Sequence, residues 1–344
     1  MNLYQAQLQI IANLPLPWDK LANKTILLSG ATGMIGKCFV DLIMLKNQLS
    51  NTNIHIIALS RKEETARERF ERYWELPEFA YTSCDINETI PECGKVDFVI
   101  HAASNTHPKQ YSGDPIGTIA SNIIGTKNLL DYAVRYRAEQ FCFLSSVEVY
   151  GENRGDVEKF DESYLGYIDC NTLRAGYPES KRVGEALCNA YGEAYQLHYV
   201  IPRLSRLYGP TMLVSDTKAI SQFIRKAADG EDIVLKSEGN QKYSYTFVTD
   251  AVNAILQIML LGINGEAYNV ADAESDIELR DLAAILAEIA GKKVVFELPE
   301  ESERKGYSTA TKAMLDAGKL EILGWKAHVH LPEGLRCTVS GRGL

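Results

Sequence analysis

Apolar runs of strand length alternate with stretches of helical spacing through the first two hundred residues. Runs that are apolar throughout predict strands at 25–30, 53–60, 96–104, 140–146 and 197–204. The stretches between them carry apolar residues every three or four positions, most clearly at 33–46, 116–137 and 177–195. Strands that are apolar on both faces and alternate with helices are typical of a parallel sheet covered by helices on both sides. We therefore predict an α/β fold.

After about residue 204 this alternation loosens, which indicates a second, smaller lobe. Helices are expected at about 216–229 and 278–291, and short strands near 233–236 and 293–297. The stretch RLYGPTM, 206–212, is expected to be a loop, and 243–261 is expected to return to the main domain.

The two parts are expected to be interleaved along the chain. A weakly helical stretch at 2–13 ends at the prolines of LPLPW, 14–18, and this gives a short leader at 1–22. The main domain is then expected at 23–204 plus about 243–270, and the smaller lobe at 205–242 plus 271–338.

Composition and charge narrow the class of protein. The 344 residues carry a net charge of −9 without a basic stripe, so nucleic acid is not an expected partner. The seven cysteines show no CxxC pair and no paired spacing, which indicates a reduced, cytoplasmic protein without a metal site. We find neither an apolar run long enough to span a membrane nor the pattern of a signal peptide.

The stretch LLSGATGMIGKCFV, 27–40, places Gly30, Gly33 and Gly36 three apart, after a predicted strand and at the start of a predicted helix. Glycines permit positive φ and let a pyrophosphate approach backbone amides, and the helix N-terminus favours the negative charge. The alternative is a tight strand–helix packing without a ligand. The context favours a dinucleotide site, although the spacing differs from GxGxxG.

The tip of the second strand bears on which dinucleotide binds. A site for NAD usually presents Asp or Glu there, whereas an arginine accommodates the 2′-phosphate of NADP. This chain has Ser60 and Arg61 at the tip and no acid, which favours NADP. Arg61 could instead be a solvated loop cation or stack on the adenine of NAD.

Two segments carry candidate catalytic groups. Tyr177 and Lys181 share one face of a predicted helix. The phenol of a free tyrosine has a pKa near 10, so it is protonated at neutral pH. A nearby ammonium favours the phenolate, which can then accept a proton from a substrate hydroxyl. Ser146, at the end of a predicted strand, could hold the same oxygen, with Glu148 two residues on. The structural alternatives are a capping hydroxyl for Ser146 and a paired surface carboxylate for Glu148.

Taken together, these motifs resemble the extended short-chain dehydrogenases/reductases, in the nucleotide-sugar epimerase/dehydratase family. The stretches that carry the resemblance, which runs from about residue 22 to about 338, are SGATGMIG at 29–36, CDI at 84–86, HAAS at 101–104, SNIIGTKNLL at 121–130, SSVEVYG at 145–151, YPESK at 177–181, YGP at 208–210 and YTFVTDAVNAI at 245–255. The resemblance implies a Rossmann-type doubly wound sheet with a smaller C-terminal α/β substrate-binding lobe. It also implies an NAD(P) cofactor, a nucleoside-diphosphate sugar as substrate, and a homodimer through helices 116–137 and 177–195.

The resemblance also implies roles for matched residues. The positions expected to contact the cofactor, besides the strand tip, are Gly30, Thr32, Gly33, Met34, Ile35, Gly36, Asp85, Ile86, Ala102, Ala103, Ser104, Asn122, Tyr177 and Lys181. Ser146, Tyr177 and Lys181 would form the catalytic triad, and Glu148 would move a proton at C5 or orient the sugar. The positions expected to contact the sugar nucleotide are Ser104, Ser146, Glu148, Arg206 and Tyr243.

Within the family, the catalytic segment looks most like UDP-glucuronate decarboxylases, with features of sugar-nucleotide 4,6-dehydratases. Three positions depart from those patterns. Val147 stands where the dTDP-glucose dehydratases have an acid, Arg206 where an asparagine precedes YGP, and Tyr243 where the family has an arginine. Arg206 would either replace the missing cation or form a structural salt bridge.

The expected activity is therefore hydride transfer between a sugar carbon, C4 in our interpretation, and nicotinamide, as in an epimerase or dehydratase. The alternatives are an NADP-dependent reductase of a sugar nucleotide or another carbonyl substrate, and a sugar-acid decarboxylase. A reductase of phenolic aldehydes or thioesters, or a binding protein without turnover, would be a different class.

Overall fold

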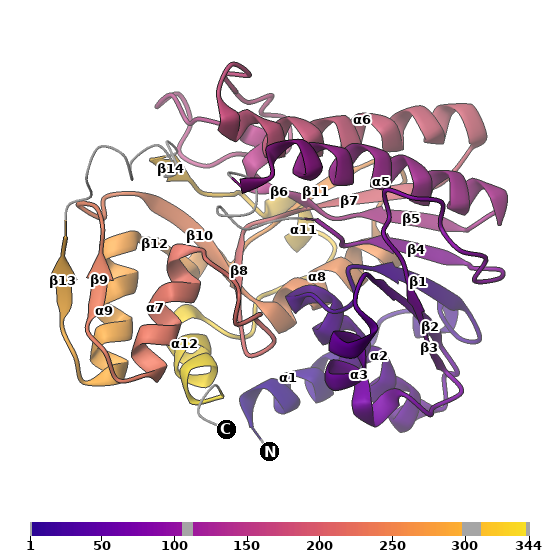
Figure 1. Ribbon diagram of the computed structural model, residues 1–344, viewed down its shortest axis with the longest axis horizontal. Helices are drawn as coiled ribbons and strands as arrows, with labels where there is room; N and C mark the ends of the chain where they lie inside the picture. Colours follow the sequence, from indigo (N-terminus) through magenta and orange to yellow (C-terminus); the bar gives the residue numbers. More distant parts are fainter. Residues whose placement is uncertain (1, 105–112, 298–310, 342–344) are drawn as a thin grey trace.

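The computed structural model describes residues 2–104, 113–297 and 311–341 (Figure 1). Its main sheet is parallel, with the strand order β11-β7-β5-β4-β1-β2-β3 and with β6 paired to β7. The strands are β1 (Thr25–Ser29), β2 (His55–Ser60), β3 (Phe79–Ser83), β4 (Phe98–His101), β5 (Gln140–Phe143), β6 (Ser145–Ser146), β7 (Tyr199–Leu204) and β11 (Ala267–Val270). The order reverses between β1 and β4, and ligands of open parallel sheets bind beside such a switch point.

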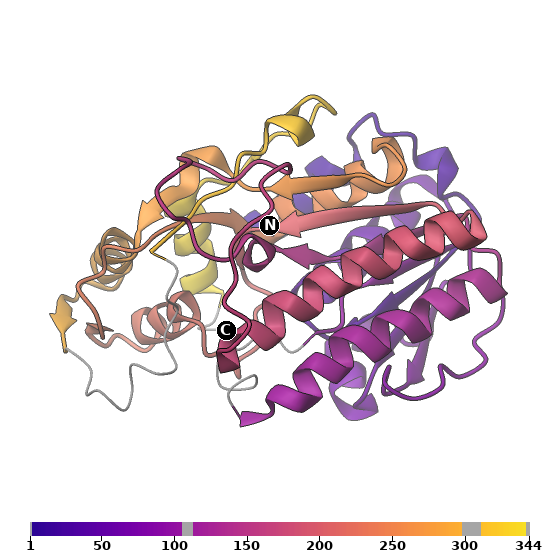
Figure 2. The same cartoon turned by 90° about the horizontal axis from the view of Figure 1, so that it is seen from above.

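Helices cover both faces of this sheet, because alternate residues of each strand point to opposite sides. Ile26 and Leu28 of β1 belong to a core shared with α1 (Leu3–Ala12), α2 (Met34–Ser50) and α8 (Val248–Leu261). Leu27 belongs to a second core, under α5 (Pro115–Arg135) and α6 (Gly176–Tyr195). Figure 2 shows α5 and α6 lying side by side over their face of the sheet. The predicted doubly wound sheet is confirmed.

The second lobe lies at one end of the sheet, on the left of Figure 1. Its strands are β8 (Arg206–Tyr208), β10 (Lys242–Phe247), β12 (Asp276–Glu278) and β14 (Lys312–Ala313) in one sheet, and β9 (Ile233–Leu235) with β13 (Val294–Phe296) in another. The remaining α-helices in the described ranges are α3 (Glu63–Phe70), α7 (Ala219–Ala228), α9 (Leu279–Ala290), α11 (Gly318–Glu321) and α12 (Leu331–Ser340). Short 3-10 turns occur at Trp18–Lys20, Glu71–Tyr73, Val147–Tyr150, Leu173–Ala175 and Ala273–Ser275.

The expected loop at 206–212 is wrong in its first half. Residues 206–208 form β8, which pairs in parallel with β10, and Leu207 and Tyr208 are buried. The segment that was expected to return to the main domain is divided: β10 belongs to the lobe sheet, α8 packs on α2, and β11 pairs with β7. The proposed domain limits stay a prediction, and residues 298–310 of the expected lobe lie outside the described ranges.

The expected leader forms α1, which is part of the first core. Asn2 caps this helix by accepting a hydrogen bond from the backbone N–H of Gln5. Leu8 and Ile11 are buried, and the hydroxyl of Tyr4 donates to Asp41 of α2 with an O–O distance of 2.7 Å. The N-terminal segment is therefore fixed to the sheet face that α2 and α8 cover, by both apolar and polar contacts.

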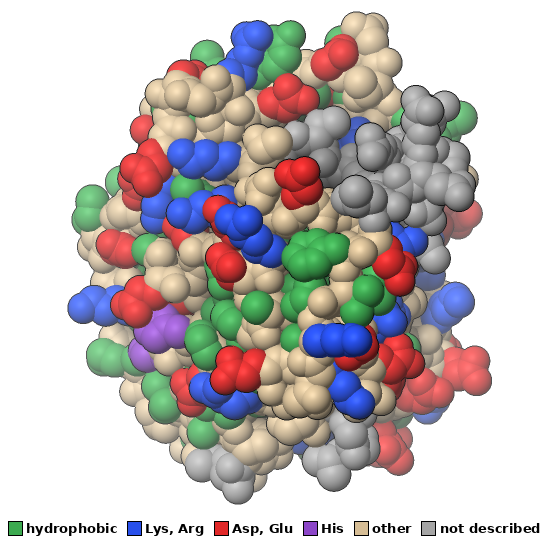
Figure 3. Space-filling view, turned by 90° about the vertical axis from the view of Figure 1, so that its left-hand side faces the viewer, with side chains coloured by type: hydrophobic (Ala, Val, Ile, Leu, Met, Phe, Trp, Pro, Cys, Tyr) green, Lys and Arg blue, Asp and Glu red, His purple; other side chains and the backbone are tan. Residues whose placement is uncertain are grey.

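Charged side chains of both signs are interspersed on the face that the lobe presents in Figure 3. Within the described ranges, no helix combines the length and apolar character needed to cross a membrane. The seven cysteines all have free thiols.

Candidate active site

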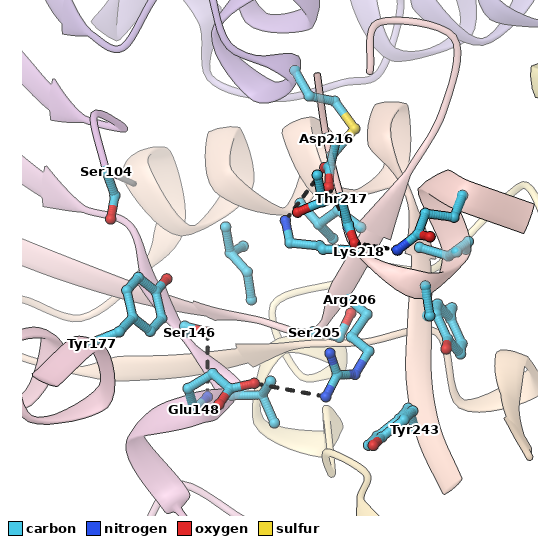
Figure 4. A pocket seen from close by; sticks show the side chains of 18 of the residues that line it. Ser104, Ser146, Glu148, Tyr177, Ser205, Arg206, Asp216, Thr217, Lys218 and Tyr243 are labelled. Carbon is cyan, nitrogen blue, oxygen red and sulfur yellow. Dashed lines mark hydrogen bonds and ion pairs between the residues drawn. The ribbon is translucent and has the colours of Figure 1, made fainter. Parts of the chain in front are cut away.

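A cavity of about 550 Å³ opens where the main sheet meets the lobe. Gly30 after β1, Ala102 after β4 and Ser146 of β6 place it at the carboxyl ends of these strands. Figure 4 shows Ser104, Ser146 and Tyr177 on one side, with Arg206, Lys218 and Tyr243 on the other. The cavity therefore lies at the switch point that the strand order predicts.

The glycine turn forms one wall of this cavity, and its outer glycines allow close backbone packing. Gly30 has φ +68°, and a Cβ there would lie 2.6 Å from the backbone nitrogen of Ala103. A Cβ on Gly36 would lie 2.5 Å from the carbonyl oxygen of Ala31. Any larger residue at either position would have to move main chain.

Gly33 has a different environment from the outer two glycines. It is the N-cap of α2, with ordinary extended φ and ψ and no side-chain cap on the helix. The nearest atom to a Cβ there is the carbonyl oxygen of Gly30, at 3.1 Å. Met34 and Ile35 of the first helical turn line the cavity with it. Since the first amides of a helix lack intrahelical partners, this turn can bind an anion.

Tyr177 and Lys181 lie one turn apart at the start of α6, and both line the cavity. Nζ of Lys181 donates to the carbonyl oxygen of Leu144 at 2.8 Å and lies 4.8 Å from the centroid of the Phe143 ring. Burial lowers the pKa of Lys181 to about 8, although the nearby Glu185 opposes the shift. The structure therefore places an amine with a lowered pKa beside the phenol.

Ser146 and Glu148 belong to the turn that follows β6. Ser146 accepts a hydrogen bond from the backbone N–H of Glu148 at 3.3 Å, so it is a capping hydroxyl that also lines the cavity. The side chain of Glu148 is 24% exposed and forms ion pairs with Arg206 and Arg174. Val147 between them is buried and supplies no polar group.

Arg206 lies over the ring of Tyr243, with 3.8 Å between its guanidinium carbon and the ring centroid. The two residues come from the paired strands β8 and β10. Arg206 forms a salt bridge with Glu148 and also places a cation beside Tyr243 in the cavity, so both sequence alternatives for Arg206 stay open.

A chain of hydrogen bonds runs from the end of β1 to α5 beneath the cavity. Ser29 Oγ is 2.9 Å from Nδ1 of His101, and Nε2 of His101 is 3.0 Å from Thr126 Oγ1. Because the Thr126 hydroxyl donates to the carbonyl of Asn122, it accepts from Nε2–H, and Nδ1 then accepts from Ser29. Burial holds the pKa of His101 well below its usual value, and Lys181 adds to the effect, so this ring is neutral.

Asn122 joins this chain of hydrogen bonds to α6. Its side-chain oxygen accepts from Ser104 at 2.7 Å, and its amide nitrogen donates to Ser180 at 2.8 Å. Ser180 in turn donates to the carbonyl of Tyr177 at 2.8 Å. Asn122 therefore connects Ser104, after β4, to the start of α6.

The other residues that were predicted to bind the cofactor do not line this cavity; they are Thr32, Ser60, Arg61, Asp85, Ile86, Ala103 and Asn122. The Ser60 hydroxyl donates to the hydroxyl of Tyr81 at 3.3 Å, and Arg61 is exposed. Asp85 accepts from the backbone N–H of Asn87 at 3.0 Å, and Ile86 is buried close to α5. The structure thus places these positions outside the space shared by Ser146 and Tyr177.

Several lining residues were not predicted, among them Arg174, Asp216 and Lys218. Nζ of Lys218 is 3.7 Å from Asp216, and burial lowers the pKa of Lys218. Arg174 lies three residues before Tyr177, and this nearness in sequence could have suggested that it lines the cavity. Asp216 and Lys218 fall at the start of the helix expected at 216–229, but the structure places them in the connection before α7, and nothing in the sequence indicated that they face the cavity.

Within the ranges described, no group of three or more His, Cys, Asp or Glu side chains is arranged to hold a metal ion.

Comparison with known proteins gives the same family as the motifs. The profile of the NAD dependent epimerase/dehydratase family matches residues 26–271. UDP-glucuronic acid decarboxylase 1 of Danio rerio is 30% identical over 321 residues, covering 92% of this chain and 72% of its own.

Solved structures of similar fold include a dTDP-glucose 4,6-dehydratase from Streptomyces venezuelae with NAD bound. It is 25% identical with a TM-score of 0.80, covering 92% of this chain and 96% of its own. A UDP-glucuronic acid 4-epimerase from Bacillus cereus, in complex with UDP-glucuronic acid and NAD, has a TM-score of 0.79 at 21% identity, covering 92% and 98%. With its fold, its cavity and a family match over most of its length, the chain belongs to the NAD-dependent epimerase/dehydratase family of extended short-chain dehydrogenases/reductases.

Proposed function

We propose that the protein oxidises a hydroxyl group, at C4 in our interpretation, on a sugar linked to a nucleoside diphosphate. The observation that carries this proposal is that Ser146, Tyr177 and Lys181 line the same cavity as the glycine turn. A proton-accepting phenol, an amine and an anion-binding turn then serve one bound substrate. The relatives of this chain act on nucleotide sugars, which supports the substrate class.

The turn between β1 and α2 fits a dinucleotide. Gly33 has no side chain toward the cavity, and the uncapped start of α2 offers amide donors for a pyrophosphate. The nicotinamide group supplies the chemistry of accepting and returning a hydride. Lys181 would hold the ribose, and Ala102 and Ser104 would lie beneath the ring.

The chain's own groups would handle the proton and the oxygen. Tyr177 would accept the hydroxyl proton, and Ser146 would donate a hydrogen bond to the same oxygen. The positive charge of Lys181 one turn away favours the phenolate. Glu148, two residues beyond Ser146, would face the next carbon of the sugar and either orient it or move its proton.

The side chains of the cavity favour an epimerase or a reductase over elimination. Elimination of a hydroxyl requires a proton donor for the leaving group. Val147 is buried and cannot serve, and Glu148 is held between two arginines. Decarboxylation of a sugar acid stays the second candidate because of the similarity to the Danio rerio decarboxylase and the presence of Arg206.

We propose NADP as the preferred dinucleotide. The tip of β2 carries Ser60 and the exposed Arg61 and has no carboxylate of its own. An arginine at this position can pair with a 2′-phosphate. A stronger dependence on Arg61 for NADP than for NAD would support this choice, and equal affinities in the wild type would contradict it.

We also infer a homodimer through α5 and α6. These helices form an outer layer of the molecule, and their exposed apolar side chains include Ile116, Ile124, Val183 and Tyr195. Such exposed apolar side chains, gathered on two packed helices, suit an interface between copies of the chain.

The experiment is a thermal-unfolding screen with UDP-, dTDP-, GDP- and CDP-sugars, each with NAD and with NADP. We expect at least one nucleotide sugar to raise the unfolding temperature and to be turned over to a product that NMR can identify. Tyr177→Phe is expected to keep the stabilisation and to lose at least about a thousandfold in kcat. If no nucleotide sugar stabilised the protein while a dinucleotide did, the substrate class would be wrong.

A further inference from the structure

The carboxylate of Glu148 lies between two guanidinium groups in the cavity. Nη2 of Arg206 is 3.7 Å from one of its oxygens, and Nη2 of Arg174 is 3.9 Å from the other. Both separations exceed the usual hydrogen-bond range of about 2.7–3.2 Å. The three side chains are between 22% and 25% exposed and line the cavity, although Nε and Nη2 of Arg206 are themselves buried.

The orientation of Arg206 is set by the aromatic ring below it. The guanidinium carbon lies 3.8 Å from the centroid of Tyr243, which is itself buried. Parallel pairing of β8 with β10 fixes the two backbones relative to one another. A stacked guanidinium keeps its donors in one plane, and this fork matches a planar carboxylate.

We propose that Arg206, assisted by Arg174, binds an anionic substituent of the sugar and so selects a sugar acid over the corresponding neutral sugar. The proposal rests on the function proposed above, with the C4 oxygen at Ser146 and Tyr177. Glu148 then faces the neighbouring ring carbon, C5. Arg206, on the far side of Glu148, reaches the group attached there, which is a carboxylate in a uronic acid. A neutral hydroxymethyl group would offer only one uncharged acceptor.

The diphosphate of the substrate is a second source of negative charge, and other cations of the cavity can pair with it. Lys218 lies on the same side of the cavity as Arg206 in Figure 4, next to the carboxylate of Asp216. Lys236 also lines the cavity from the lobe side, after β9. Arg206 differs from these lysines because it pairs with Glu148, two residues after Ser146.

The test compares UDP-glucose with UDP-glucuronic acid by calorimetry, on protein saturated with dinucleotide. We expect the wild type to bind the acid at least about tenfold more tightly. Arg206→Gln removes the charge. We expect it to lower the affinity for UDP-glucuronic acid by about 10- to 100-fold and the affinity for UDP-glucose by less than about threefold. Arg206→Lys keeps the charge without the fork and is expected to lie between. Arg135→Gln, on the exposed surface of α5, is the matched control and is expected to leave both affinities unchanged.

The outcomes separate this proposal from the proposed function. Equal losses for both sugars in Arg206→Gln would mean that the arginine binds the shared diphosphate, and would overturn the proposal. A wild type without preference for the acid would overturn it as well. Binding of neither sugar, with the dinucleotide still bound, would overturn the proposed function together with this inference. A thermal-unfolding curve for each variant shows whether a loss of binding comes from misfolding.

Discussion

Nζ of Lys181 donates a hydrogen bond to the backbone carbonyl of Leu144 at 2.8 Å, in a side chain that is only 3% exposed. The contact fixes the amine beneath the cavity at the end of β5, within one turn of Tyr177. Burial disfavours the charged amine and lowers its pKa to about 8. The amine of Lys181, which we propose favours a phenolate at Tyr177, is therefore buried at a cost in stability.

Lys181→Met is expected to raise the free energy of unfolding at pH 7 by about 1–3 kcal/mol while abolishing turnover. The unfolded lysine has a pKa of about 10.4, and the gap to about 8 corresponds to about 3 kcal/mol. Loss of the bond to Leu144 offsets part of this gain. The folded state binds the proton less tightly than the unfolded state. The destabilisation of the wild type by the buried charge of Lys181 is therefore complete below about pH 8, and it disappears as the pH rises toward about 10.4.

Urea unfolding of both proteins at pH 7 and pH 10 checks this expectation, because other titrating groups cancel in the difference between them. The advantage of the methionine variant should shrink at the higher pH. A variant less stable than the wild type at pH 7 would show that the Leu144 hydrogen bond outweighs the burial of charge.

The glycine turn offers a matched pair of variants. Gly33→Ala is expected to unfold within about 1 kcal/mol of the wild type, because its backbone angles suit any residue, and to lose at least about tenfold in dinucleotide affinity. Gly30→Ala is expected to lose about 3 kcal/mol or more of stability, because its φ is +68° and a Cβ would lie 2.6 Å from backbone nitrogen. Denaturant unfolding and dinucleotide titration distinguish the two effects. Equal behaviour of the two variants would contradict the separate roles assigned to these glycines.

The local pattern of the sequence was sufficient to predict the strands whose side chains are buried on both faces of the main sheet. β1 and β2 are apolar throughout, so their positions followed from the residues themselves. β8 could not be predicted in this way, because three residues acquire strand geometry only through pairing with β10, which is distant in sequence. α1 lies in the stretch 2–13 that was expected to be weakly helical, but its burial against α2 and α8 could not be predicted from local pattern.

The candidate site divides in the same way. Tyr177 and Lys181 are one helical turn apart, so their proximity is a local property. The contact between Arg206 and Tyr243 depends on the pairing of two strands, and the sequence left open whether the arginine faced the cavity. Lys218 lies just before α7, at the start of the expected helix 216–229, and its position in the cavity depends on contacts between the lobe and the main sheet that local spacing does not show.

The proposed dimer makes a prediction about mass. The wild type is expected to have about twice the chain mass of 38.3 kDa in light scattering. Replacing Ile124 and Val183 by glutamate places charge on the outer surface of α5 and α6, and we expect this double variant to be monomeric. Ile322→Glu, at an exposed apolar residue after α11, is the control and should remain dimeric. A monomeric wild type would contradict the inference.

The contact of α1 with Asp41 allows the contribution of the N-terminal segment to the stability of the protein to be measured. Asp41 is buried and accepts hydrogen bonds from Tyr4 at 2.7 Å and Tyr73 at 2.8 Å, and it pairs with Lys37 and Arg72. Burial alone would raise the pKa of Asp41, but Lys37 and the other donors hold it below the usual value. Each donor therefore stabilises the ionised carboxylate in the folded protein.

Tyr4→Phe is expected to lower the free energy of unfolding by about 1–2 kcal/mol, the contribution of one hydrogen bond to a charged group. Asp41→Asn is expected to lower it by about 3 kcal/mol or more, because the partly buried Lys37 then lacks its carboxylate. The folded pKa of Asp41 is lowered, so its contribution is present above the unfolded pKa of about 3.9 and is lost as the pH falls below that value. The difference between the wild type and Asp41→Asn should therefore narrow below about pH 4, as measured by denaturant unfolding across that range. Tyr164→Phe, which removes a hydroxyl that donates to the exposed carboxylate of Asp156, serves as the control for Tyr4→Phe. A Tyr4→Phe protein as stable as this control would mean that α1 is held by its apolar face alone.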